Sequence, residues 1–142
     1  MNSRRSFITL ASSIAVALPV FPTFGQAQRR IPLSQLEAMF ADMRTKTKWD
    51  VDGPLLWGYF FLDPSSEKLK AVAADLEGSG FRVVGIVKVA AKQAWRLHVE
   101  RIEVHTPASL NARNNDLYLL VEKHSLASYD GMDVGPAPAG EK

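Results

Sequence analysis

The chain has 142 residues, a length typical of one domain, and 46% of them are hydrophobic, which is enough to form a core. It contains no cysteine, which excludes disulfides, thiolate metal sites and cysteine nucleophiles. Lys and Arg outnumber Asp and Glu by 17 to 15, but Arg4 and Arg5 stand in a leader-like segment. Without these two the charges balance, and basic residues alternate with acidic ones, so we expect no nucleic-acid partner.

Residues 1–27 are predicted to be a signal peptide. Arg4 and Arg5 precede Phe7 and an apolar run that ends at Leu18, and this order resembles the twin-arginine export signal. The alternative is an ordinary secretory leader in which the two arginines happen to be adjacent. The twin-arginine route carries folded proteins, so we expect this one to fold in the cytoplasm and to work in the periplasm or otherwise outside the cell membrane.

The leader has features of a cleaved segment. Gly25-Gln26-Ala27 supplies the small residues that a signal peptidase reads, which places the cut between Ala27 and Gln28. The apolar run has about 12 residues, whereas a membrane-spanning helix needs roughly 20. We therefore expect no stable membrane span after cleavage, with an uncleaved anchor as the alternative.

Residues 28–48 are predicted to form a short helix and a linker. Apolar side chains recur there at spacings of three and four, which is typical of a helix with one buried stripe. Ser34 is placed to cap this helix. The stripe consists of Leu33, Leu36, Phe40 and Met43.

Residues 55–62 are apolar throughout and are bounded by Gly-Pro and Asp-Pro, which predicts a strand buried on both faces. Trp57, Tyr59 and Phe61 would share one face of this strand, and Phe60 and Leu62 the other. One face must pack on helices, and the other needs a cover. The N-terminal helix or a second copy of the chain could supply that cover. The functional alternative is a surface for a ligand or a partner peptide.

A helix is predicted after Asp63, because a capping serine and an early acid follow Pro64. It would bury Leu69, Val72, Ala73 and Leu76 and end at Gly78 and Gly80. A hairpin should follow, with Phe81, Val83, Val87 and Val89 pointing inward from the first strand and Trp95, Leu97 and Val99 from the second. The apolar phase then shifts to Ile102 and Val104, which predicts a bulge near Glu100 and Arg101.

The last long helix is predicted to begin at Thr106-Pro107 and to run to about His124. Its inward side chains would be Leu110, Leu117, Leu120, Val121 and His124. Asn114 falls on the same stripe and would need a hydrogen-bond partner if buried. A final strand is predicted from Ser128 to Val134, and residues 137–142 form a tail predicted to be disordered.

The order of elements after the first helix is strand, helix, strand, strand, helix, strand. This βαββαβ order predicts an α+β, ferredoxin-like fold, with two helices on one face of a four-stranded antiparallel sheet. The first and third strands would be central. The predicted domain covers residues 49–136.

Short aromatic motifs in this region resemble the family named for the regulator of ribonuclease E activity B (RraB). They are Trp57-Gly58-Tyr59-Phe60-Phe61, the segment 111–124, and Tyr129-Asp130-Gly131. Met132 stands where the family commonly has tryptophan. The resemblance implies a ferredoxin-like fold and a non-catalytic, protein-binding role. The family's namesake is strongly acidic and inhibits a cytoplasmic ribonuclease, whereas this chain is charge-balanced and carries an export signal. The resemblance therefore implies the fold but not the target.

No catalytic residues, metal ligands or cofactor are predicted. His98 and Glu100 share a strand face and could make two metal ligands, but catalytic zinc normally takes three from the protein. Asp130 and Asp133 are acid–base candidates by residue type only. A turn in which Asp130 accepts backbone hydrogen bonds before Gly131 is the structural interpretation.

Two functions remain open from the sequence. The first is an exported, non-enzymatic regulatory or binding module that contacts an unknown protein. The alternative is a binder of a small molecule or a haem-type ligand, or an enzyme, that uses the sheet face of a ferredoxin-like dimer. The predicted partner or ligand surface comprises Trp57, Tyr59, Phe61, Tyr129, Asp130 and Gly131.

Overall fold

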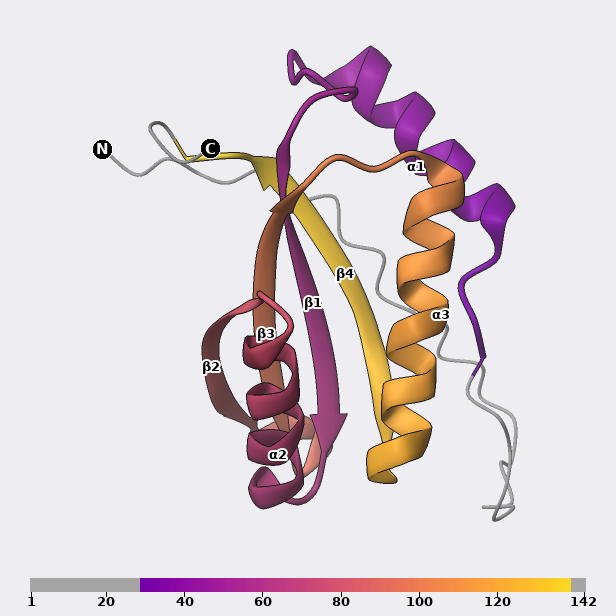
Figure 1. Cartoon of the computed structure of the whole chain (residues 1–142). Coiled ribbons are helices and arrows are strands. Elements are labelled where there is room, and N and C mark those ends of the chain that lie inside the picture. The colour runs from indigo at the N-terminus through magenta and orange to yellow at the C-terminus, as the bar shows by residue number, and fades with distance from the viewer. Residues whose placement is uncertain (1–28, 139–142) are drawn as a thin grey trace.

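The computed structural model describes residues 29–138. The predicted leader with Arg4, Arg5 and Phe7, the cleavage site at Ala27 and Gln28, and the last four residues of the tail lie outside the described residues. The described chain is an α+β protein with a four-stranded antiparallel sheet and three α-helices (Figure 1).

The sheet contains β1 (Leu55–Asp63), β2 (Arg82–Val89), β3 (Ala94–Glu103) and β4 (Ser128–Pro136). Its order is β2-β3-β1-β4, so β1 and β3 are the central strands, as predicted, and the arrangement is consistent with a ferredoxin-like fold. The uninterrupted apolar run of β1 fits a strand that has a neighbour on each side and is buried along nearly its whole length.

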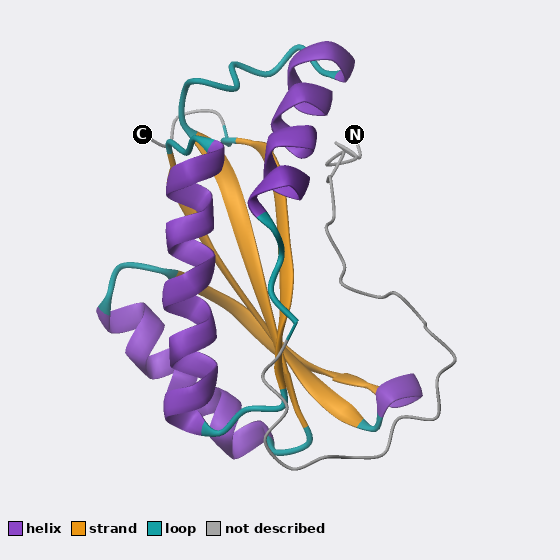
Figure 2. Cartoon of the chain, turned by 90° about the vertical axis from the view of Figure 1, so that its right-hand side faces the viewer, coloured by secondary structure: helices purple, strands orange, loops and turns teal. Residues whose placement is uncertain are grey.

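The helices are α1 (Leu33–Lys46), α2 (Ser66–Gly78) and α3 (Pro107–His124), and a short 3₁₀ turn, η1 (Ala90–Lys92), joins β2 to β3. Figure 2 shows α2 and α3 on the same side of the sheet. The core lies between these helices and the sheet. The ring of Phe40 in α1 stacks on the ring of Trp57 in β1, with 5.9 Å between centroids, so α1 packs on the same core.

Two of the three helices begin with the caps that their sequences predict. The Ser65 side chain accepts a hydrogen bond from the backbone of Lys68 at the start of α2. Thr106 and Ser109 form a reciprocal capping box at the start of α3. The prediction for α1 was wrong, because the helix begins at Leu33 and Pro32 precedes it, so Ser34 is already inside the helix. Leu33 is 43% exposed and does not belong to the buried stripe.

The bulge predicted in β3 lies instead in β2. The pairing of β1 with β3 is continuous, whereas the pairing of β2 with β3 shifts between Val83 and Gly85. This extra residue turns Val83 and Ile86 toward the core and leaves Val87 53% exposed, so the inward position predicted for Val87 was wrong. The phase shift in β3 reflects charged residues on its inner side.

The inner side of α3 is partly polar. Leu110, Leu117 and Val121 are buried as predicted. Asn114 is also buried, and its Oδ1 accepts a hydrogen bond of 2.7 Å from the Tyr129 hydroxyl. This contact supplies the partner that the sequence requires and ties α3 to β4.

The end of α3 and the end of β4 differ from the prediction. The Nε2 atom of His124 lies 2.8 Å from Asp75 on α2, so this histidine joins two helices and does not enter the core. Strand β4 continues past Val134, because Gly135 and Pro136 still pair with the start of β1.

Candidate functional site

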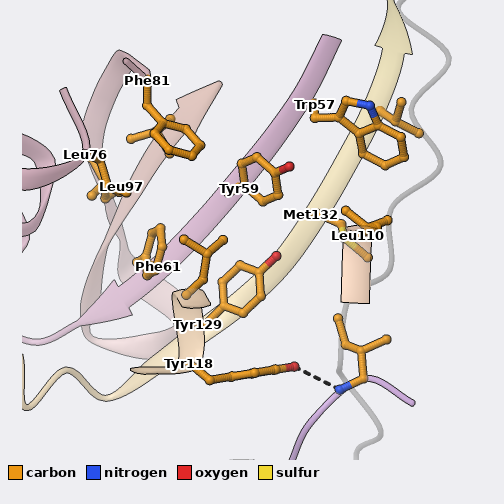
Figure 3. Packing of buried hydrophobic residues seen from close by; sticks show 14 of the residues in the cluster. Trp57, Tyr59, Phe61, Leu76, Phe81, Leu97, Leu110, Tyr118, Tyr129 and Met132 are labelled. Atoms are coloured by element: carbon orange, nitrogen blue, oxygen red, sulfur yellow. Dashed lines mark hydrogen bonds between the residues drawn. The ribbon is translucent and has the colours of Figure 1, made fainter. Parts of the chain in front are cut away.

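The four aromatic residues of the predicted surface lie inside the protein. The side chains of Trp57, Tyr59, Phe61 and Tyr129 are at most 1% exposed, belong to the core and lie on one side of β1 and β4 (Figure 3). Helix α1 was expected to cover the face of the sheet opposite the other two helices, and this was wrong, because Phe40 of α1 lies on Trp57 on the core side. A partner that meets the described surface cannot reach these four side chains, so their geometry supports a packing role.

The other two residues of that predicted surface lie in β4. Asp130 occupies a bulge where the pairing of β4 with β1 shifts between Phe60 and Phe61, and its carboxylate lies 3.9 Å from Lys92. Gly131 is buried and has a φ of 101°, a conformation that side chains other than glycine rarely adopt. Asp130 and Gly131 therefore belong to a bulge inside the strand, in place of the predicted turn.

The opposite side of the sheet is covered by none of the three described helices, and we call it the open face. Because side chains alternate along a strand, it carries the residues of β1 and β3 that do not point into the core. Its members are Leu56, Gly58, Phe60 and Leu62 of β1, Arg96, His98, Glu100 and Ile102 of β3, Gly131 and Asp133 of β4, and Val87 of β2.

Gly58 leaves a gap in the middle of the open face that neighbouring polar side chains fill. Its partner on β3 is Glu100 and its partner on β4 is Asp133. A Cβ atom at Gly58 would stand 2.8 Å from Nε2 of His98 and would also collide with the Asp133 carboxylate. The side chains of His98 and Asp133 therefore both lie over the backbone of β1 at Gly58. Glu100 is 2% exposed and pairs with Arg82 on β2.

A cationic and aromatic stack lies beside this gap. The His98 ring stacks on the Phe60 ring, with 4.4 Å between centroids and 24° between planes. The Arg96 guanidinium lies over the same Phe60 ring, 5.2 Å from its centroid. The open face therefore combines one aromatic ring, a histidine, two buried carboxylates and the guanidinium of Arg96.

A second polar cluster lies on the core side of the sheet, at the junction of β3 with α3, and we call it the Glu103 cluster. The Tyr59 hydroxyl donates a hydrogen bond of 2.9 Å to Glu103 Oε2, and His105 Nε2 lies 2.8 Å from the same oxygen. Arg113 pairs with the other oxygen of Glu103. Nδ1 of His105 lies 2.9 Å from Ser109 Oγ.

These contacts change the acidity of two groups. Burial raises the pKa of Glu103, but the hydrogen bond to His105, the charge of Arg113 and the hydrogen bond from Tyr59 outweigh it and lower that pKa to about 2. Burial, followed by the nearby Glu103 charge, raises the pKa of the Tyr59 hydroxyl well above its ordinary value.

The Glu103 cluster borders a shallow hollow of about 290 Å³, which is also lined by Asp116. Glu103 nevertheless has four partners within the protein, namely Tyr59, His105 and Arg113, and the Nε atom of Arg101 at 3.5 Å. An acid whose hydrogen bonds are filled in this way stabilises the junction between β3 and α3 and is poorly placed for proton transfer.

Within residues 29–138 no group of three or more histidine and acidic side chains has a geometry that could hold a metal ion, and this applies to His98 with Glu100. The same part of the chain contains no helix that is both long enough and apolar enough to cross a membrane.

Sequence patterns identified only part of these two clusters. The sequence predicts that His98 and Glu100 share a polar strand face. Their position near Asp133, however, depends on the pairing of β1 with both β3 and β4. Gly58 within an aromatic strand is the one sequence signal that could have pointed to the gap. The Glu103 cluster was missed, because its residues come from two strands, a loop and a helix.

Comparison with known protein families identifies the family to which the chain belongs. The family model described as "RraB: Regulator of ribonuclease activity B" matches residues 34–134, which include nearly all of α1 and of β4. A search of curated proteins finds no match to the chain.

Proposed function

We propose that this chain, which belongs to the RraB family of ribonuclease-activity regulators, is an exported, non-enzymatic module that binds a protein other than ribonuclease E. The family match over residues 34–134 carries the protein-binding part of this proposal. Regulators of this family act by binding proteins, and membership is compatible with the absence of enzymatic activity.

The proposed location rests on the leader. Arg4 and Arg5 precede Phe7 and a moderately apolar run, in the order of a twin-arginine signal. A protein exported by this route folds first and then leaves the compartment in which ribonuclease E acts. The proposed change of target follows from this separation.

The charge of the chain supports a different target as well. The resemblance points to a strongly acidic namesake, whereas the residues after Ala27 hold equal numbers of acidic and basic side chains. Electrostatic complementarity governs association rates and partner choice, so a surface of different charge favours a different partner.

Export can be tested with the full chain by changing Arg4 and Arg5 together to lysine. We expect the variant to stay in the cytoplasm, because the twin-arginine route requires both guanidinium groups, while the unchanged chain reaches the periplasmic fraction. Changing the downstream pair Arg29 and Arg30 to lysine is the matched control and should leave export unchanged. Normal export of the first variant would contradict the proposed route.

Partner binding can be tested by cross-linking the full chain in intact cells and identifying the covalent adducts by mass spectrometry. We expect one dominant protein of the cell envelope. The same purified chain should leave RNA cleavage by ribonuclease E unchanged at a tenfold molar excess. A chromophore or metal bound in stoichiometric amount to natively purified protein would instead favour the ligand-binding alternative.

A further inference from the structure

We propose that the open face of the sheet binds an acidic segment of the partner protein, and that Arg96 is the receptor for one of its carboxylates. This inference rests on the proposed function, because it names the chemistry of the partner that a protein-binding module would recognise.

Arg96 is the arginine of the sheet that lacks an acidic partner within the described residues. Arg82 pairs with Glu100, and the Nε atom of Arg101 lies 3.5 Å from Glu103. Arg96 contacts the Phe60 ring, and its Nε is buried without a hydrogen-bond partner. The Arg96 side chain is half-buried, so a carboxylate from outside would have to reach the outer N–H groups of the guanidinium, which no acid of the described residues contacts.

A carboxylate fits this receptor better than other acceptors do. The guanidinium is planar and presents parallel N–H groups that match the two oxygens of a carboxylate. Contact with Phe60 holds the guanidinium plane and excludes water from one side of it. The ring is therefore a support that fixes the orientation of the donors.

The distribution of charge on the open face favours an anionic guest. Arg82 lies opposite Glu100 on this face and its side chain is 67% exposed, and Arg96 is half-buried, whereas the carboxylates of Glu100 and Asp133 are buried. A segment that approaches the sheet therefore meets cations first. This arrangement steers acidic chains toward the face and disfavours basic ones.

The surroundings of Arg96 favour a polypeptide over a nucleic acid. Val87 lies directly opposite Arg96 on the outermost strand and is exposed, so it can contact an apolar side chain next to the acidic one. A nucleic acid gains affinity by neutralising several phosphates at once. Here Arg82 already lies beside Glu100 and Lys92 beside Asp130, so of these three cations only Arg96 lacks an acidic partner within the described residues.

The proposal can be tested by fluorescence anisotropy with the full chain and a labelled ten-residue peptide of alternating glutamate and valine. We expect binding at low salt that weakens as salt is added. Arg96→Gln should weaken it about tenfold or more, as the loss of a hydrogen bond to a charged group predicts. Arg96→Lys keeps the positive charge but loses the parallel N–H groups of the guanidinium, so it should give an intermediate affinity.

The matched control is Arg44→Gln, which removes the same charge from α1, where Arg44 pairs with Asp52. It should leave peptide binding unchanged. The proposal is overturned if the glutamine version of the peptide binds equally well, or if Arg96→Gln behaves like Arg44→Gln. Displacement of the peptide by equal concentrations of inorganic phosphate or of an RNA oligonucleotide would overturn the assignment to a protein partner.

Cross-linking in cells separates this inference from the proposed function. If the adduct formed by the unchanged chain is lost in Arg96→Gln, both are supported. If the same adduct persists in Arg96→Gln, the chain still binds a protein but the role of Arg96 is refuted. If neither chain forms an adduct, the proposed function itself fails. Urea unfolding midpoints of the two variants check that both are folded.

Discussion

At the scale of single residues, Glu103 is held ionised by three different elements of the fold. Tyr59 comes from β1, His105 from the loop before α3, and Arg113 from α3 itself. A half-buried acid with these partners stabilises the folded state only while it is ionised, since protonation removes the ion pair and leaves the arginine without its partner. The stability of the protein should therefore depend on the ionisation of this one group.

The folded-state pKa of Glu103 is about 2, below its ordinary value of 4.5. The stabilisation is therefore complete above about pH 4.5 and is lost as the pH falls toward 2. We expect Glu103→Gln to lower the free energy of unfolding by about 3 kcal/mol at pH 7. The difference from the unchanged chain should shrink between pH 4.5 and 2, as measured by urea unfolding.

A suitable control for this pH dependence is Glu77→Gln, which changes an exposed glutamate of α2. Its unfolding free energy should follow that of the unchanged chain at each pH. A constant difference between Glu103→Gln and the unchanged chain across this range would show that Glu103 does not titrate as described.

At the scale of elements, β1 carries both the core and the open face. Its odd-numbered aromatic residues fill the space below the helices, and its even-numbered positions hold Gly58 and Phe60 on the other side. A central strand can serve two faces in this way because its side chains alternate. The glycine matters because side chains from β3 and β4 occupy the space above it.

We predict that Gly58→Ala destabilises the protein by about 1–3 kcal/mol, the range typical of overpacking. The added methyl group would collide with Asp133 and stand 2.8 Å from Nε2 of His98. Gly85→Ala is the matched control, since it also lies in a strand but no atom lies within 4 Å of the added carbon. Its unfolding midpoint should be unchanged or slightly raised. If Gly58→Ala and Gly85→Ala change the unfolding midpoint equally, the side chains of His98 and Asp133 do not crowd the space above Gly58.

At the scale of the whole molecule, α1 belongs to the same folded unit as the sheet. Leu36, Met39, Phe40 and Met43 are all buried in the common core. The backbone N–H of Ile31, just before α1, donates a hydrogen bond of 2.8 Å to the Tyr118 hydroxyl of α3. The family match beginning at residue 34 also includes this helix.

If α1 is part of one cooperative unit, Phe40→Ala should lower the unfolding free energy of the entire domain by about 3–5 kcal/mol. The transitions followed by tryptophan fluorescence and by far-ultraviolet circular dichroism should coincide. Leu33→Ala, on the exposed side of the same helix, should change stability by less than about 1 kcal/mol. Two separate transitions in Phe40→Ala would show that α1 is an appendage.

The sequence by itself determined the order and the approximate limits of the elements. The strong signals were local: Gly-Pro and Asp-Pro at the ends of β1, Thr106 and Pro107 at the start of α3, and the apolar stripe of α2. Each of these depends on the conformation of a few neighbouring residues. The family also followed from local motifs, since short aromatic segments near Trp57 and Tyr129 carry the resemblance.

Only the tertiary structure decided which side chains meet. The aromatic residues of β1 and β4 resembled a binding surface until three helices were found on one side of the sheet. The bulge in β2, the gap above Gly58, the Glu103 cluster and the unpaired donor of Arg96 all depend on register between strands that are far apart in sequence. A shift of one residue in register turns every side chain to the other face, and no local pattern contains that information.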